Sequence, residues 1–388
     1  MGQEIFYIGN FGFPDRNASG KRVLGNCLLL KALGFTPICI GNGAAGTIEA
    51  EGILCHNLRI SNTQRVLGKG LQQVIDLIMP YSESLKCVIF YGALFTQKEN
   101  LALIRWCQKR EIPVYYDQVD WFELNWHNPL RAMVRATNHY LMNHRVIPLC
   151  DGVICISRYL EEHHRKIGKK TVVIPPLSAV SGCGKTDTAK NADKIRFVYA
   201  GTTSDVERPV EQWKDRLDIM FSALASASQL PDTRPFQMDV YGMEQEQYIR
   251  MFPKELHEKG EAVLKILGDR VVFHGLVPNA EAMEGIRNAH FTVLIRDKKR
   301  STMAGFPTKV SESLSCGTPV ICSDTSDLRK YIQNGVNGYI FENEELESIY
   351  EAVLKFSDEQ LLTMKRNCQT TPFYCMNFSE EMKRFLEK

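Results

Sequence analysis

The sequence is poor in the features that mark several large classes of protein. No apolar run reaches the ~18 residues of a membrane-spanning helix, and the chain begins with the strand-like EIFYIG rather than a basic leader. No pair among the 12 cysteines has the C-x-x-C spacing of a metal or redox site. Several of these cysteines lie within apolar runs, where a free thiol packs as a small hydrophobe. We therefore expect no metal site, a reducing cytoplasm as the location, and at most a peripheral contact with a membrane.

Neither sign of charge is in excess. The chain has 47 lysines and arginines against 45 aspartates and glutamates, a net charge of +2. This balance gives no general electrostatic reason to bind nucleic acid, and none is expected as a partner. With 44% hydrophobic and 24% charged residues, the composition is that of a globular protein. The 388 residues suffice for about two domains.

Two nucleotide-binding motifs are incomplete. After the first expected strand, the loop GNFGFP lacks the third glycine of the dinucleotide fingerprint, so no nicotinamide cofactor is expected. The sequence GCGKT at residues 182–186 is similar to the end of a phosphate-binding loop, but Ala179 stands where that motif requires glycine. Residues 178–193 are rich in small and polar side chains, and we interpret them as an interdomain linker.

Short apolar segments alternate with helical ones on both sides of this linker. The expected strands before it are residues 5–9, 36–40, 87–91, 114–116, 152–156 and 172–174, with helices over 20–33, 63–79 and 97–110. After it, strands are expected at 195–200, 238–241, 271–273, 292–295, 319–322 and 339–341. Such alternation predicts parallel sheets covered by helices on both faces. The fold class is therefore α/β, with two Rossmann-like domains, residues 1–177 and 194–369, facing one another across a crevice.

The most informative stretch is GFPTKVSESLSCGTPVICSDTSDLRKYIQNGVNGYIF, residues 305–341. Pro307 suits the first position of a helix, and Gly317 suits the left-handed residue that ends it. Lys309 and Glu312 lie one turn apart on a side of this helix that can face a ligand. The N-terminus of a helix favours an anion such as a phosphate. A carboxylate one turn further in can accept hydrogen bonds from ribose hydroxyls.

FPTKVSESLSCGTPVICSD followed by IQNGVNGYIF resembles the nucleotide-sugar stretch of the family 4 retaining glycosyltransferases of the GT-B fold, especially the branch that builds bacterial surface polysaccharides. The resemblance implies that the first domain binds the acceptor and the second the nucleotide sugar, and that residues 370–388 pack back on the first domain. In that family two glutamates separated by seven residues contact the donor. Glu312 matches the second, which holds the ribose, and Ala304 stands at the position of the first, which holds the sugar.

The same resemblance implies a set of donor-binding residues: Gly12, Gly201, Leu276, Gly305, Phe306, Pro307, Thr308, Lys309 and Glu312. Leu276 matches the residue that meets the base. Lys214 and Arg296 are candidates for neutralising the departing diphosphate, and with Asp120 they are the predicted catalytic residues. The alternatives are that Lys214 is a surface lysine and that Arg296 is paired with Asp297 or another acid.

Acidic residues gather in DQVDWFELNWHN, directly after the strand expected at 114–116. Here VDW resembles the acid and tryptophan of the polysaccharide branch, so that Asp120 could orient an acceptor hydroxyl and Trp121 could stack on a sugar. Asp117 and Glu123 complete the predicted acceptor-binding set. The alternative is a solvated, helix-capping turn.

Residues 128–147 combine arginines with apolar side chains such as Met133 and Val134. A basic, partly apolar helix can lie on an anionic membrane, which would suit a lipid-linked acceptor. An ordinary amphipathic domain helix is the alternative.

Taken with the resemblance, the sequence predicts a retaining glycosyltransferase. It would move a sugar from a nucleoside-diphosphate sugar, with UDP as the preferred nucleotide, to a hydroxyl of a glycan or polyprenyl-linked acceptor in surface polysaccharide synthesis. The reaction is expected to need no metal or cofactor, and to take place in the cytoplasm or at the inner face of the cell membrane. Two other functions remain open: a non-catalytic binding subunit, suggested by Ala304, and a sugar-nucleotide epimerase on the same fold.

Overall fold

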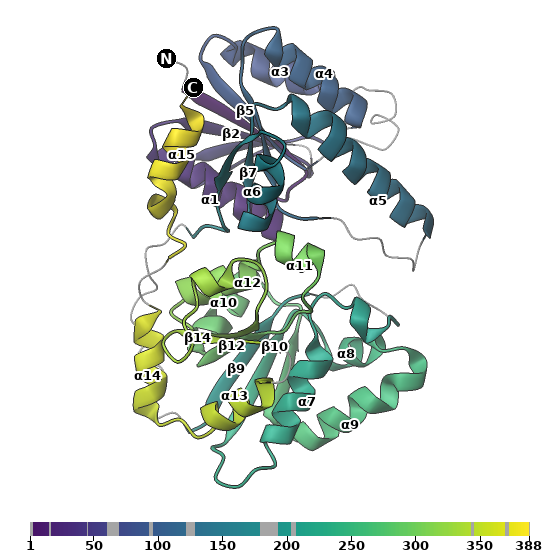
Figure 1. Ribbon diagram of the computed structural model, residues 1–388, viewed down its shortest axis with the longest axis vertical. Helices are drawn as coiled ribbons and strands as arrows, with labels where there is room; N and C mark the ends of the chain where they lie inside the picture. Colours follow the sequence, from purple (N-terminus) through teal and green to yellow (C-terminus); the bar gives the residue numbers. More distant parts are fainter. Residues whose placement is uncertain are drawn as a thin grey trace. The chain divides into compact units, whose positions relative to one another are not determined.

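The structure, a computed structural model, describes residues 3–14, 17–44, 46–59, 70–92, 96–121, 129–178, 193–202, 207–342, 345–368 and 372–387. The chain divides into two compact units, each built on its own sheet (Figure 1). The first unit comprises Met1–Ala179, Met303–Phe306 and Cys375–Lys388, and the second comprises Val180–Thr302 and Pro307–Tyr374. Apart from its two ends, the predicted linker at 178–193 lies outside the described residues.

The first unit is built on an eight-stranded sheet with the order β3-β4-β2-β1-β5-β6-β7-β8. Its strands are β1 (Glu4–Gly9), β2 (Thr36–Gly41), β3 (Gly46–Ala50), β4 (Ile53–Asn57), β5 (Leu85–Tyr91), β6 (Val114–Gln118), β7 (Gly152–Cys155) and β8 (Lys170–Val173). All neighbours are parallel except β3 and β4, which form an antiparallel hairpin at one edge. The order reverses at β1, which lies between β2 and β5.

The β3–β4 hairpin is absent from the sequence prediction, and the all-parallel sheet predicted for this domain was wrong at this edge. β3 is almost wholly exposed and shows no apolar alternation, so it lacks the signal by which a strand is recognised. Its turn, Glu51 and Gly52, has positive φ at both residues, as a tight hairpin requires. This hairpin also explains GNGAAG at residues 41–46, a G-x-G-x-x-G sequence that the prediction overlooked. It leads into β3 and not into a helix, so it lacks the helix N-terminus on which that fingerprint depends.

Helices of the first unit are α1 (Ala18–Ala32), α3 (Gly70–Ile78), α4 (Gln97–Gln108), α5 (Pro129–Leu141), α6 (Arg158–Arg165) and α15 (Ser379–Leu386). Side-chain caps fix where three of them begin: Asn17 for α1, Thr96 for α4 and Ser157 for α6. α15 packs beside α1 and β8 in this unit (Figure 1). The ring of Phe385 lies 4.8 Å from that of Tyr115 on β6.

The second unit is built on a six-stranded parallel sheet with the order β11-β10-β9-β12-β13-β14. Its strands are β9 (Ile195–Ala200), β10 (Phe236–Tyr241), β11 (Val271–Gly275), β12 (Phe291–Leu294), β13 (Val320–Ser323) and β14 (Gly338–Phe341). Each lies within two residues of its predicted position. The order reverses at β9, which pairs with both β10 and β12. In doubly wound sheets, ligands bind beyond the carboxyl ends of the strands at such a reversal.

Helices cover both faces of this sheet: α7 (Leu217–Ala227), α8 (Gln245–Met251), α9 (His257–Leu267), α10 (Asn279–Asn288), α12 (Thr308–Ser315), α13 (Leu346–Val353) and α14 (Asp358–Asn367). The short helix α11 (Arg300–Ala304) begins in the second unit, and its last two residues belong to the first. Successive residues of β9 point to opposite faces. Phe197 packs against Tyr350 of α13, whereas Val198 packs with Ile286 of α10 and Cys316 at the end of α12. Within the described residues, no helix is long and apolar enough to span a bilayer.

Candidate functional site

Glycines follow the carboxyl ends of neighbouring strands in the second unit. Gly201 follows β9, Gly242 follows β10 and Gly275 ends β11. Gly242 has φ +94°, and a Cβ atom on it would lie 2.8 Å from the Gly201 carbonyl. A Cβ atom on Gly201 would lie 2.2 Å from Nζ of Lys309. Backbone atoms without side chains therefore line the ends of these three strands. We call this edge the glycine rim, and Lys309 of α12 lies directly beside it.

A buried carboxylate holds two cations beside this rim. Asp215 lies just before α7, and its Oδ1 accepts a hydrogen bond from Nε of Arg296 at 2.7 Å. Its Oδ2 accepts hydrogen bonds from Nζ of Lys309 and, at 2.8 Å, from the hydroxyl of Tyr199. Burial would raise the pKa of Asp215, but Arg296 and Lys309 outweigh it and hold that pKa far below its usual range. Two cations on one carboxylate leave a net charge of +1.

The guanidinium of Arg296 is anchored at one end only. Nε is bound to Asp215 and the backbone N–H donates to Ser323 Oγ at 2.8 Å. Within the described residues, neither Nη group of Arg296 makes a hydrogen bond. An arginine fixed through Nε presents its two Nη groups as a planar fork, the geometry that binds phosphate bidentately. Arg296 is therefore paired with an acid, which is one of the two predicted alternatives. Its Nη donors are still available for a phosphate, which is the other.

Lys309 lies in the first turn of α12, as predicted. Its Nζ donates to Asp215 and, at 3.0 Å, to the oxygen of Tyr199, and lies 4.3 Å from the centre of the Tyr199 ring. Its third N–H has no acceptor among the described residues. Burial lowers the pKa of Lys309 below its ordinary value, although the Asp215 carboxylate opposes the shift. Lys309 and Arg296 together form a cationic pair at the β9–β12 reversal, with donors that could bind an anion.

A second ion pair joins the segment before α7 to the segment after β12, with the arginine now on the first segment and the aspartate on the second. Arg216 donates a hydrogen bond to Asp297 at 2.8 Å, and its Nε and Nη2 both donate hydrogen bonds to the carboxylate of Asp218. Its backbone N–H donates to the carbonyl of Ile295 at 2.8 Å. The dipeptide Asp215–Arg216 is therefore matched by Arg296–Asp297 at the end of β12. This reciprocal pairing fixes the loop before α7 against the segment after β12 that carries Arg296.

The other predicted donor residues fall in several places. Glu312 is half-buried in α12, one turn from Lys309, and its charge raises the pKa of that lysine. α12 begins at Thr308, and Pro307 caps it one position earlier than the first helical position predicted for it. Leu276 is 81% exposed directly after β11. Gly305 and Phe306 belong to the first unit.

Lys214 is exposed between the buried Trp213 and Asp215, and α7 begins only at Leu217. Lys214 therefore lies in the loop before the helix and not within it. The missed residue is its neighbour Asp215, and an acid next to a predicted cationic site was the only signal for it.

In the first unit, Asp117 is buried, and both of its carboxylate oxygens accept hydrogen bonds from other side chains. Its side chain accepts hydrogen bonds from Arg22, at 2.6 Å from Nη2, and from Tyr7 and Asn26. Arg22 also donates to the carbonyl of Ile174 at 2.9 Å. Asp117 is only 1% exposed, which does not agree with direct contact with an acceptor. Its carboxylate joins α1 to β6, a role that a row of acids in the sequence does not reveal. Gly12 lies against α1, where a Cβ atom on Gly20 would lie 2.0 Å from its carbonyl oxygen.

Asp120 and Trp121 follow β6. Asp120 is exposed, and Trp121 is half-buried with its ring 4.9 Å from that of His139 on α5 and 4.7 Å from that of His163 on α6. His164 hydrogen-bonds with Gln118, and burial lowers its pKa to about 4. The predicted Glu123 lies outside the described residues.

The helix expected within 128–147 is present as α5. Met133 and Val134 are 60% and 61% exposed and directly precede an exposed Arg135. Tyr140 is also 60% exposed. Apolar and basic side chains thus share the open surface of this helix.

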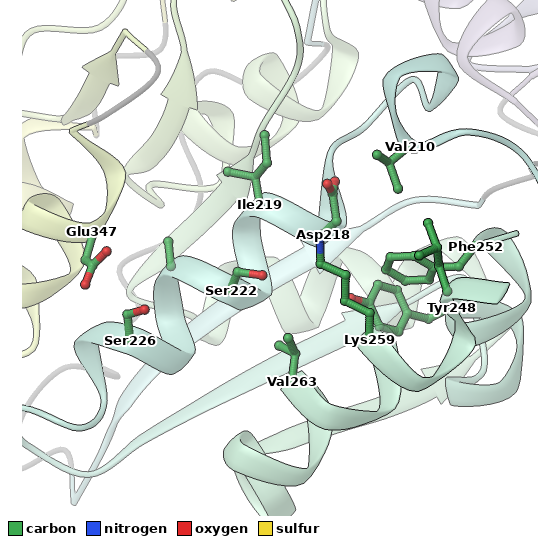
Figure 2. A pocket seen from close by; sticks show the side chains of 12 residues that line it. Val210, Asp218, Ile219, Ser222, Ser226, Tyr248, Phe252, Lys259, Val263 and Glu347 are labelled. Atoms are coloured by element: carbon green, nitrogen blue, oxygen red, sulfur yellow. The ribbon is translucent and has the colours of Figure 1, made fainter.

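A separate cavity of about 300 Å³ lies beside α7, α8 and α9. Figure 2 shows Ser222 and Ser226 along α7, with Tyr248, Phe252 and Lys259 on the neighbouring segments. Asp218 lines the cavity and is the residue it shares with the Arg216 ion pairs. No predicted site residue lines it. Across the residues that the structure describes, no cluster of three or more histidine, cysteine or acidic side chains could hold a metal ion.

Residues 221–370 match the family model described as glycosyl transferases group 1, which supports the predicted glycosyltransferase class. The matched segment includes Arg296, Lys309 and Glu312. No curated protein sequence matches the chain.

Solved structures share the fold over nearly the whole chain. HepE of Anabaena in complex with UDP is 17% identical with a TM-score of 0.63, covering 99% of both chains. Sucrose-phosphate synthase from Thermosynechococcus elongatus is 16% identical with a TM-score of 0.67, covering 98% of both. A glycosyltransferase from Rickettsia africae is 13% identical with a TM-score of 0.65, covering 99% of this chain and 98% of that one. The fold is GT-B, and the predicted α/β fold of two Rossmann-like domains is confirmed.

Proposed function

We propose that the protein is a retaining glycosyltransferase that moves a sugar from a UDP-sugar to a hydroxyl of a glycan or polyprenyl-linked acceptor in surface polysaccharide synthesis. The observation that carries the proposal is the cationic pair of Arg296 and Lys309 on the Asp215 carboxylate. It lies at the carboxyl ends of β9 and β12, inside the segment that matches the glycosyl transferases group 1. The choice of UDP rests on the resemblance and on the UDP bound by HepE.

In this proposal the donor diphosphate lies against the Nη groups of Arg296 and the third N–H of Lys309. Glu312 accepts hydrogen bonds from the ribose, and Leu276 lies beside the base. As the bond between sugar and phosphate breaks, negative charge grows on the leaving oxygen, and the fixed cations stabilise it without moving. For reaction on the same face of the sugar, that phosphate oxygen takes the acceptor proton. No protein base and no metal ion are then required.

We assign the acceptor to the first unit, beside Asp120 and Trp121. Asp117 is left out of this role because its carboxylate is buried in the pair with Arg22. Since Met133, Val134 and Tyr140 are exposed beside Arg135, α5 would rest on an anionic membrane at the inner face of the cell and bring a lipid-linked acceptor within reach. Anionic vesicles should therefore co-sediment the protein more strongly than zwitterionic ones, and Met133→Asp with Val134→Asp should abolish the difference.

The direct test begins with thermal unfolding against UDP, GDP, dTDP, CMP, ADP and NAD. A ligand at 100 times its dissociation constant stabilises the folded state by about 2.7 kcal/mol. The matching nucleotide sugars are then incubated with and without glycan acceptors, and products are followed by mass spectrometry. Transfer to an acceptor supports the proposal. Interconversion of the donor sugar without an acceptor would identify an epimerase, and binding without any reaction would identify a non-catalytic subunit.

A further inference from the structure

We propose that Asp215 is the positioning residue of the diphosphate site: it spaces Arg296 and Lys309 on its two oxygens and keeps Lys309 protonated while the remaining donors of both cations face the ligand. This inference rests on the function proposed above. No motif or resemblance marks Asp215, whose importance comes only from the contacts that converge on it. It makes no contact with the substrate and acts through the two cations.

The geometry gives each carboxylate oxygen a separate task. Oδ1 accepts a hydrogen bond from Nε of Arg296 at 2.7 Å, and Oδ2 accepts hydrogen bonds from Nζ of Lys309 and from the hydroxyl of Tyr199. The side chain of Asp215 is 10% exposed, and those of Arg296 and Lys309 are 9% and 17% exposed. Two like charges at this depth would repel one another and lose hydration unless a carboxylate lay between them. Asp215 is that carboxylate.

The charged groups that face Lys309 are Asp215, Arg296 and Glu312, and the hydroxyl of Tyr199 is the other titratable group in contact with it. Burial and the charge of Arg296 favour the neutral amine, whereas Asp215 is the acid in direct contact with the ammonium. Removing the charge of Asp215 should therefore let Lys309 lose its proton at a much lower pH. Affinity for a diphosphate should then depend on pH in a range where the natural protein shows no such dependence.

The experiment measures UDP and uridine binding by calorimetry from roughly pH 7.5 to 9.5, above the last ionisation of the diphosphate. We expect a nearly constant UDP affinity for the natural protein. For Asp215→Asn, we expect the affinity to fall by about tenfold or more across this range, equivalent to the loss of one charge-assisted hydrogen bond. Uridine affinity should follow the same curve in both proteins, including the loss of the uracil N3 proton towards the upper end of this range, and each UDP affinity is divided by it before the profiles are compared. Adding Lys309→Met to Asp215→Asn should remove the pH dependence, because the titrating group is gone.

Asp297→Asn is the matched control. It removes a carboxylate from the reciprocal ion pair on the same segment, but this carboxylate binds Arg216 and Lys299 rather than Arg296 or Lys309. It should reduce stability without creating a pH dependence. Asp215→Glu keeps the charge but moves it by one methylene, and should give weaker UDP binding with a flat profile. This second variant serves as the test if Asp215→Asn does not fold.

Three results would overturn the inference. They are a flat profile for Asp215→Asn, the same pH dependence for Asp297→Asn, and binding of UDP by Asp215→Glu as tight as that of the natural protein. In each case the natural protein still binds UDP, so the proposed function survives. A natural protein that binds no nucleoside diphosphate would instead overturn the proposed function and this inference with it.

Discussion

Replacing Arg296 with lysine tests the donor site most directly. In the structure the guanidinium uses Nε to hold Asp215 and leaves two Nη groups for a ligand. A lysine has a single ammonium head, so it cannot both bind Asp215 and present a bidentate fork to phosphate. The ion pair with Asp215 is kept, and we therefore expect a loss of only about 1 kcal/mol or less in the free energy of unfolding.

The expected loss of UDP affinity follows from the hydrogen bonds removed. A hydrogen bond to a charged group contributes about 1.5 to 3 kcal/mol, so losing one of the pair should weaken binding by roughly 10- to 100-fold. Uridine, which lacks the phosphates, should bind equally to both proteins. Calorimetry with UDP, UMP and uridine provides the assay, and denaturant unfolding checks that the variant is folded.

Arg216→Lys is the comparison, because Arg216 lies in the same network but its donors are taken by Asp218 and Asp297. It should lower stability more than Arg296→Lys and UDP affinity less. If Arg296→Lys folds normally and binds UDP as tightly as the natural protein, the guanidinium does not contact phosphate and the donor site has been placed wrongly.

Four further substitutions test other parts of the structure. Glu312→Ala should weaken UDP binding by roughly 1 to 3 kcal/mol through lost ribose hydrogen bonds, and unchanged calorimetric affinity in a folded variant would exclude that contact. Gly201→Ala would place Cβ 2.2 Å from Nζ of Lys309; the lysine must move, so diphosphate affinity should fall while circular dichroism stays unchanged. Burial lowers the pKa of His164 and of His290 to about 4, against 6.5 for a free histidine. Each lowered pKa adds stability that is complete above pH 6.5 and disappears as the pH falls towards 4, by up to about 3 kcal/mol per histidine. Urea unfolding at pH 7 and 4.5 should show a smaller acid loss for His164→Gln and for His290→Gln, and equal losses would contradict the assignment.

Most of the fold could be predicted because parallel strands are buried on both faces and stand out as short apolar runs. All six strands of the second sheet were located in this way. The β3–β4 hairpin could not be, since β3 is exposed along nearly its whole length. A strand is held at such an edge by backbone hydrogen bonds to its partner, and these leave no pattern in the sequence.

The candidate site shows the same limit in another form. Lys309 and Glu312 share one helical turn, so a local pattern is enough to propose them. Asp215 is 81 residues from Arg296 and 94 from Lys309. Their meeting depends on the strand order that brings β9 beside β12, which only the folded sheet reveals. Lys214 was singled out by resemblance, and the residue with the converging contacts is the one after it.

Ala304 is the position where the chain departs from the family it resembles, and the structure gives a physical reason to take that departure seriously. Its side chain is fully buried, and its carbonyl oxygen accepts a hydrogen bond from Ser157 Oγ at 2.6 Å within the first unit. A glutamate here would need either an unpaired buried carboxylate or a shift of α11 that breaks this hydrogen bond, either of which costs several kcal/mol.

We therefore expect Ala304→Glu to lower the free energy of unfolding by more than about 2 kcal/mol and to leave UDP-sugar affinity no tighter than before. Ala304→Ser, of similar size, should be tolerated and serves as the control. A stable Ala304→Glu variant that binds UDP-sugar more tightly would mean that the backbone around α11 already suits the missing glutamate. The failure of that variant would instead mean that the donor sugar is held by groups other than the one the family uses.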